Sequence, residues 1–258
     1  MSDQPTVVGA PYPGAPTTYA EAQAAGVELR APRWGLADVA IAILLALLVP
    51  LVVLSTFLAV GAPRDGALIL LGAATLPWIG FGLWPWLTTR LQGNGARIDL
   101  GFDLRWSDLG WGIGGGFACL VLGGTVAWLT TLVAGDFESS AGNAVVGADV
   151  ARWVIWVFAV CALVGAPVVE ELCFRGLAFA SVARWASRRG LPAVPLAVVL
   201  SAVLFTLIHL EPVRIPLLLT IGLVLSWLRA RTGRVGASIV AHAFNNLWGV
   251  IGILTLTT

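Results

Sequence analysis

Charged residues are scarce in this chain of 258 residues: Asp, Glu, Lys and Arg make up 11% of it, against 58% hydrophobic residues. Soluble domains usually carry about 25% charged residues, so the scarcity excludes an ordinary soluble domain and indicates a lipid bilayer as solvent. Lysine is missing, the formal net charge is +1, and no long basic or acidic run occurs. A nucleic-acid partner is therefore not expected.

Cysteine is also scarce, and its spacing excludes two further classes. Cys119, Cys161 and Cys173 lie in apolar stretches without CxxC spacing. They can build neither a disulfide framework nor a zinc knuckle, and we predict that they are small core residues. The motif HExxH does not occur, which excludes a zinc site carried on one helix in that pattern.

Long apolar runs, in contrast, are abundant. A spanning helix needs about 20 apolar residues, and seven segments qualify: 36–61, 66–88, 107–135, 152–174, 192–210, 212–230 and 235–256. Short cytoplasmic loops accumulate arginine. With the N-terminus inside, the cytoplasmic segments hold Arg30, Arg33, Arg90, Arg97, Arg105, Arg175, Arg184, Arg188, Arg189, Arg229, Arg231 and Arg234. The predicted fold is an all-α polytopic transmembrane bundle of about seven spans with a cytoplasmic N-terminus.

The two ends of this arrangement differ in composition. Residues 1–35 are rich in Pro, Gly, Ala and Thr, and they lack the basic start and apolar run of a signal peptide. We predict a flexible cytoplasmic tail there and a transmembrane domain over residues 36–258. The third span carries a set of glycines that predicts close helix packing: Gly110, Gly112, Gly114, Gly115, Gly116, Gly123 and Gly124.

Ionisable groups inside a membrane are costly and therefore indicate function. Four-residue spacing predicts an ion pair between Glu171 and Arg175 on one helical face, while Glu170 points about 100° away and is free to act as an acid or base. The histidines follow later in the chain, four residues after Phe205 and four residues before Asn246. We predict one cavity lined by a working set of Glu170, His209, His242 and Asn246, supported by Glu171, Arg175 and Phe205.

Two mechanisms fit this set, and the residues leave both open. In one, Glu170 and His209 deprotonate a water, while His242 and Asn246 donate to the developing oxyanion. In the other, Glu170, His209 and His242 bind a divalent metal such as zinc, which activates the water. Two non-proteolytic alternatives also remain: a non-catalytic membrane partner, such as an immunity or regulatory subunit, that retains the motif for packing, and a transporter with a proton-relay carboxylate.

The ordered motifs EExxxR, FxxxH and HxxxN resemble those of the CAAX protease and bacteriocin-processing (CPBP) family of intramembrane proteases. This family includes type II CAAX prenyl endopeptidases and bacterial Abi proteins, and the similarity covers about residues 150–250. It implies a helical membrane endopeptidase that opens toward the cytoplasm, with Glu170 and His209 activating water and His242 and Asn246 stabilising the oxyanion. The family is often called metalloprotease, although a metal-free glutamate mechanism has also been argued. The expected partners are the bilayer and a peptide or membrane-protein substrate, which the composition suggests is bacterial.

The depth of the clusters conflicts with the simple span boundaries. If the fourth span ended at Glu171 and the fifth at His209, the two would lie about 30 Å apart, on opposite faces of the membrane. A fourth helix over about 158–182 and a fifth starting near Pro195 bring them to a similar depth. Residues 144–157 then become an interfacial lead-in.

Overall fold

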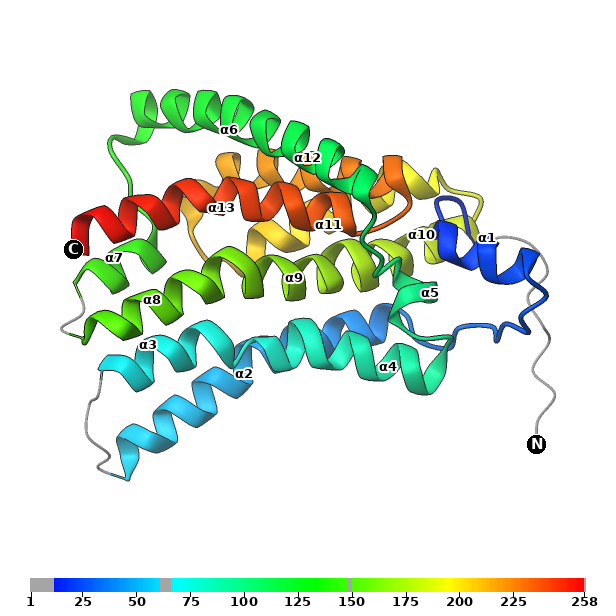
Figure 1. Ribbon diagram of the computed structural model, residues 1–258, viewed down its shortest axis with the longest axis horizontal. Coiled ribbons are helices and arrows are strands. Elements are labelled where there is room, and N and C mark those ends of the chain that lie inside the picture. The colour runs from blue at the N-terminus through cyan, green and yellow to red at the C-terminus, as the bar shows by residue number, and fades with distance from the viewer. Residues whose placement is uncertain (1–11, 61–65, 148–149, 258) are drawn as a thin grey trace.

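The computed structural model describes residues 12–60, 66–147 and 150–257, which contain helices and no strands. Long helices run side by side along one direction, so their ends form two opposite faces (Figure 1). The helices in chain order are α1 (Thr17–Ala24), α2 (Leu36–Ala59), α3 (Gly66–Thr75), η1 (Ile79–Leu83), α4 (Trp84–Gln92), α5 (Ala96–Leu100), α6 (Trp106–Ala134), α7 (Ser140–Val146), α8 (Arg152–Val160), η2 (Cys161–Gly165), α9 (Ala166–Glu171), η3 (Leu172–Ala178), α10 (Phe179–Ser187), α11 (Ala193–Ile208), η4 (Pro212–Arg214), α12 (Ile215–Thr232) and α13 (Gly236–Thr257).

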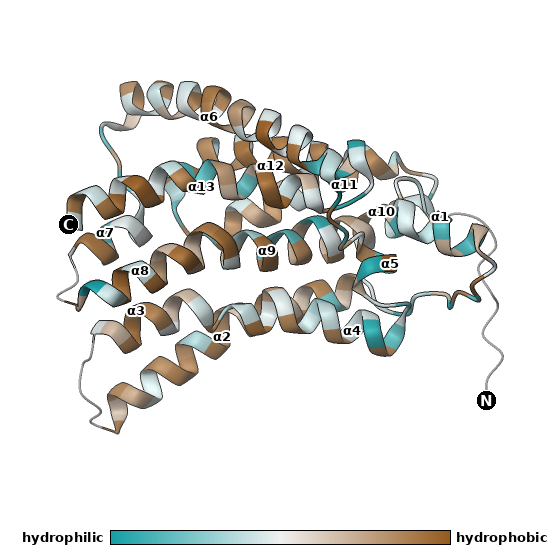
Figure 2. Cartoon of the chain, viewed as in Figure 1, coloured by the Kyte–Doolittle hydropathy of each residue, from teal (hydrophilic) through white to brown (hydrophobic). Residues whose placement is uncertain are grey.

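The described residues contain six helices that are long and apolar enough to cross a membrane. Hydrophobic residues predominate along the long helices (Figure 2), and many of their large apolar side chains are exposed. The fifth predicted segment, 192–210, forms α11, which is apolar but shorter, at 16 residues. The chain is an all-α, multi-pass membrane protein, as predicted, and its described part has six membrane-length helices and one short apolar helix.

The fourth spanning helix differs most from its predicted boundaries. It runs without interruption from Arg152 to Ser187, 36 residues or about 54 Å. The boundary 152–174 was therefore wrong at its C-terminal end, and the alternative 158–182 was too short at both ends. Residues 152–157 are helical and belong to α8, which continues directly into the rest of this helix; their interfacial position stays a prediction. The extension places Glu170 and Glu171 at the middle of the helix rather than at its end.

Residues 12–35 pack against the helix ends, and the prediction of a flexible tail is wrong for them. They include α1, and Tyr12, Tyr19 and Trp34 are each no more than 3% exposed. Trp34 donates a hydrogen bond from Nε1 to Asp99 in α5, at 2.9 Å, and the Arg184 guanidinium lies 3.7 Å above its ring. This segment covers the face formed by α5 and the ends of α4 and α10 (Figure 1). Residues 1–11 lie outside the described residues.

Several arginines assigned to loops are structural. Four of the twelve are no more than 8% exposed: Arg175, Arg184, Arg229 and Arg234. Arg234 donates to Asp108 at 2.6 Å, and Arg229 donates to backbone carbonyls of residues 14 and 175. Part of the arginine asymmetry thus reflects packing at one end of the bundle. The cytoplasmic position of that end stays a prediction.

The hydroxyl of Tyr12 provides a test of how tightly this segment packs. It donates to the Asp99 carbonyl at 3.2 Å, and burial raises the pKa of Tyr12 to about 12, although Arg229 and Arg184 act in the opposite direction. Because the folded-state pKa exceeds the usual value near 10, the contribution of Tyr12 to stability is complete below about pH 10 and is lost as the pH rises toward about 12. In a spectroscopic titration we expect the last tyrosinate to form near pH 12 in wild type and this step to vanish in Tyr12→Phe. Ionisation of both tyrosines near pH 10 would contradict the packing.

Candidate active site

The helix that carries the two glutamates is irregular on both sides of them. Two π-helical turns, η2 and η3, bracket the six residues of α9. Such turns shift the backbone hydrogen bonds and occur often at functional sites. Here three carbonyls on or beside the turns accept bonds from side chains of other helices: Ala162 from Asn246 at 3.0 Å, Phe174 from Ser201 at 2.8 Å and Arg175 from Arg229 at 3.0 Å. Helices α11, α12 and α13 are thereby attached to the glutamate helix around the site.

Glu171 and Arg175 form the predicted ion pair, at 2.8 Å, with both side chains completely buried. Arg175 also donates to Ser226 Oγ at 3.3 Å and to the Gly222 carbonyl at 3.0 Å, both in α12. A buried guanidinium needs partners for its donors, because an unpaired buried charge costs several kcal/mol. Arg175 of the ion pair therefore also holds α12 against η3.

The imidazole of His242 lies between the two glutamates. Its Nδ1 is 3.0 Å from Glu171 Oε1, and its Nε2 is 3.9 Å from Glu170 Oε2. With Glu171 accepting the Nδ1 proton, Nε2 is directed toward Glu170. This corrects one sequence-based assignment: Glu171 does more than pair with Arg175, because it also orients His242. Glu170 Oε2 is buried without a hydrogen-bond partner, and such atoms usually have a water or ligand partner.

His209 lies on the other side of a phenylalanine. The Phe205 ring is 4.7 Å from the His209 ring and 5.7 Å from the His242 ring, centroid to centroid, and the Arg175 guanidinium lies 4.4 Å from it. His209 Nδ1 is 2.6 Å from the Phe205 carbonyl. The described residues place no carboxylate within ion-pair distance of His209, so its cooperation with Glu170 stays a prediction.

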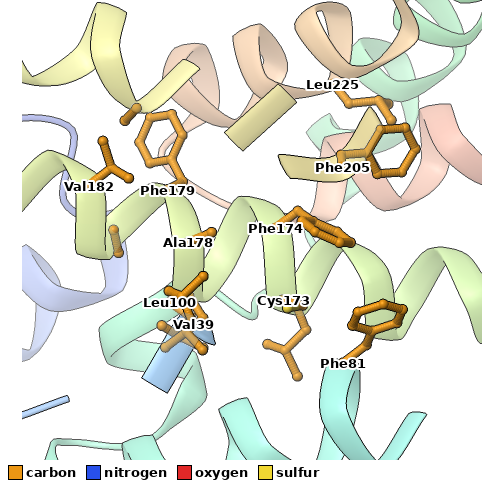
Figure 3. Packing of buried hydrophobic residues seen from close by; sticks show 14 of the residues in the cluster. Val39, Phe81, Leu100, Cys173, Phe174, Ala178, Phe179, Val182, Phe205 and Leu225 are labelled. Carbon is orange, nitrogen blue, oxygen red and sulfur yellow. The ribbon is translucent and has the colours of Figure 1, made fainter. Parts of the chain in front are cut away.

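Aromatic packing holds Phe205 in place. Phe174 of η3 lies between Phe205 and Phe81 of η1 (Figure 3), with ring centroids 5.6 Å and 5.3 Å away. The helix ends at Ile208, His209 caps it, and Leu210 follows with φ of 55°. This left-handed conformation is uncommon outside glycine and turns the chain sharply. The short α11 therefore presents His209 at its end, inside the bundle.

Asn246 reaches η2 rather than the glutamates, because its amide donates to the Ala162 carbonyl. An amide nitrogen has two donors, so one N–H remains for the predicted oxyanion role. Sequence reasoning missed the partners of the ion pair in α12. The available signal was Ser226 and Arg229, two polar residues three apart in an apolar segment, which a helix places on one face.

A divalent metal is the remaining alternative for the site. The described residues contain no group of three His, Cys, Asp or Glu side chains arranged to hold a metal ion. Glu170 and His242 face each other, whereas His209 is separated from His242 by the Phe205 ring. Because the predicted ligands Glu170, His209 and His242 do not form such a group, we derive no step through a metal.

One family model matches the chain. Residues 152–248 match the family described as type II CAAX prenyl endopeptidase Rce1-like. The matched segment begins with α8 and extends into α13, so it contains both glutamates, Arg175, both histidines and Asn246. A search of curated proteins and a search of solved structures each found no match. The family resemblance that the three motifs predicted is thus confirmed over this segment.

Proposed function

Because residues 152–248 belong to the CAAX protease family, we propose that the protein is an intramembrane endopeptidase whose general base is Glu170. One observation carries this proposal. Two successive carboxylates of one helix reach opposite nitrogens of the His242 imidazole, at 3.0 and 3.9 Å. Glu171 is fully buried, whereas the side chain of Glu170 is 19% exposed. The inner carboxylate orients the imidazole, and the outer one keeps a buried Oε2 without a hydrogen-bond partner, which would accept from a water admitted to the site together with the substrate.

The proposed reaction begins with a water held between Glu170 Oε2 and His242 Nε2. The two atoms are too far apart to bond directly, at 3.9 Å, and both can accept a hydrogen bond from one water. Glu170 takes a proton as the water oxygen bonds to the peptide carbonyl carbon. The free N–H of Asn246, together with His209, supports the oxyanion. The protonated Glu170 then gives its proton to the leaving amine as the C–N bond breaks.

This assignment modifies the pairing predicted from the sequence. There, His209 assisted Glu170, and His242 faced the oxyanion. The contacts favour His242 as the partner of Glu170, since His209 bonds to the Phe205 carbonyl instead. Glu171 acts through His242 and is a positioning residue, like the carboxylate that orients the histidine in a catalytic triad. The substrate is a peptide or membrane protein, cleaved on the cytoplasmic side.

Cleavage of a quenched transmembrane or prenyl-peptide reporter in proteoliposomes tests the proposal. We expect His242→Ala to lower the rate by about 10² or more, because Glu170 loses its partner, and His209→Ala to have the smaller effect. The same preparations should hold well below one metal ion per chain and keep their rate in a chelator. Wild-type cleavage no faster than that of His242→Ala or of liposomes without protein would favour a non-catalytic membrane partner. Stoichiometric metal lost in His209→Ala would favour the metal mechanism.

A further inference from the structure

A long groove opens on the outer surface between α6 and α12. Its volume is about 900 Å³, and its lining includes Ser107, Trp111, Gly114, Leu122, Leu223 and Trp227. The large apolar side chains among these are at least 36% exposed, so in a membrane the groove faces lipid. The glutamate site does not use any of these residues.

Helical spacing separates the groove from the candidate active site. Gly222 and Ser226 of α12 bond to Arg175. The residues that directly follow them, Leu223 and Trp227, line the groove. Successive residues on a helix point about 100° apart. One face of α12 therefore holds the buried ion pair, and the adjacent face forms the groove wall.

The glycines of α6 divide into two groups. A Cβ at Gly112, Gly115 or Gly116 would lie within 2.6 Å of a neighbouring side chain, so these three allow close packing, as predicted. A Cβ at Gly110 or Gly114 would meet nothing within 4 Å, and both residues line the groove. Packing inside the protein does not explain why these two positions are glycine. Their missing side chains keep the floor of the groove open.

One end of the groove is aromatic and positively charged. Trp111 and Trp227 meet edge to face at 6.0 Å, and the Arg231 guanidinium lies 5.3 Å from the Trp111 ring. Arg231 is exposed and has no carboxylate partner among the described residues. The neighbouring Arg234, in contrast, is neutralised by Asp108. Tryptophan and arginine in this combination are typical of the headgroup level of a bilayer.

We propose that this groove binds one anionic phospholipid, with an acyl chain along α6 and the phosphate at Arg231. The length of the groove supports a phospholipid as its occupant. Ser107 and Leu122 lie 15 positions apart along α6, or about 22 Å, which covers one leaflet of about 15 Å and its headgroup region. The unpaired charge selects an anionic headgroup over a zwitterionic one, since an arginine at the surface of an anionic membrane contributes noticeably to binding.

Native mass spectrometry of protein released from nanodiscs of equal phosphatidylglycerol and phosphatidylcholine content tests the proposal. We expect wild type to retain one phosphatidylglycerol. Gly114→Leu should lose it, because the added side chain fills the groove, whereas Gly124→Leu should keep it. Gly124 lies in the same helix, also has open space at its Cβ and does not line the groove, so it controls for the change in helix propensity.

The headgroup contact has its own control. Arg231→Gln should reduce the preference for phosphatidylglycerol about fivefold, whereas Arg189→Gln, which removes a similar arginine lying 4.7 Å from Trp185, should not. Equal retention by the two glycine variants, or equal binding of both lipids by wild type, would overturn the proposal. The experiment measures lipid retention, so its result does not depend on whether the protein cleaves peptides.

Discussion

Glu170→Gln should abolish nearly all hydrolysis while leaving the fold intact. Glutamine keeps the volume of the side chain but cannot take a proton from water, and a general base contributes about 10² to 10⁴ to the rate. The side chain is partly exposed and, among the described residues, makes no ion pair with an arginine, so the free energy of unfolding should change little. The measurement is the steady-state rate of reporter cleavage, with thermal unfolding of the same preparations.

The outcome separates catalysis from packing. A loss in kcat with KM unchanged indicates an interaction made only in the transition state. The matched control is Glu138→Gln, an exposed glutamate beyond the end of α6, which should cleave at the wild-type rate. If Glu170→Gln cleaved within twofold of wild type, Glu170 would not be the base, and the endopeptidase proposal would lose its main support.

Glu171→Ala should have the largest effect on stability, about 3 to 5 kcal/mol. It removes the carboxylate partner of Arg175, whose side chain is completely buried, and it removes the partner of His242 Nδ1. Breaking a buried pair by deleting one member leaves an uncompensated charge, which explains the expected size. Denaturant titration in mild detergent measures the change, with Glu138→Ala as the exposed control.

A double variant distinguishes the effect of the unpaired Arg175 charge on stability from the effect of lost side-chain packing. Replacing both members, with Glu171→Met and Arg175→Met, removes the charges together and keeps apolar volume, which is often close to neutral. We therefore expect the double variant to be more stable than Glu171→Ala, although inactive because His242 is no longer oriented. A double variant that lost the sum of both single effects would show that the two side chains act independently, contrary to the observed geometry.

The fold was largely predictable from the sequence, whereas the membership of the site stays a prediction. Apolar runs and their spacing gave the all-α membrane bundle, because the bilayer requires long helices that satisfy their own backbone. The four-residue spacings predicted the Glu171–Arg175 pair and the contact between Phe205 and His209, and both are present, the second as an edge-to-face contact of the two rings. Each of these contacts joins residues of the same helix, where the sequence separation determines which side chains are neighbours.

The helix boundaries were harder to predict, because hydropathy does not record where a helix leaves the membrane. The fourth helix continues through Arg175 and Arg184 to Ser187, although charged residues usually mark a span end. Partners on other segments make this possible: Glu171 and α12 neutralise Arg175, and the backbone near Trp34 accepts from Arg184. Residues 12–35 likewise read as flexible until their contacts with α5 and α10 are known.

Sequence alone thus determined that the protein lies in a lipid bilayer, that it is helical, and which few polar residues are candidates for catalysis. Composition and short spacings are local properties, so they can be read without the fold. Only the tertiary structure decided which of those residues meet. His242 contacts both glutamates across 71 or more positions of sequence, and Asn246 bonds to a carbonyl 84 positions away. These contacts depend on how α9, α11 and α13 pack and on the π-helical turns that shift the helical register around Glu170 and Glu171. Residue spacing within one helix does not contain this information.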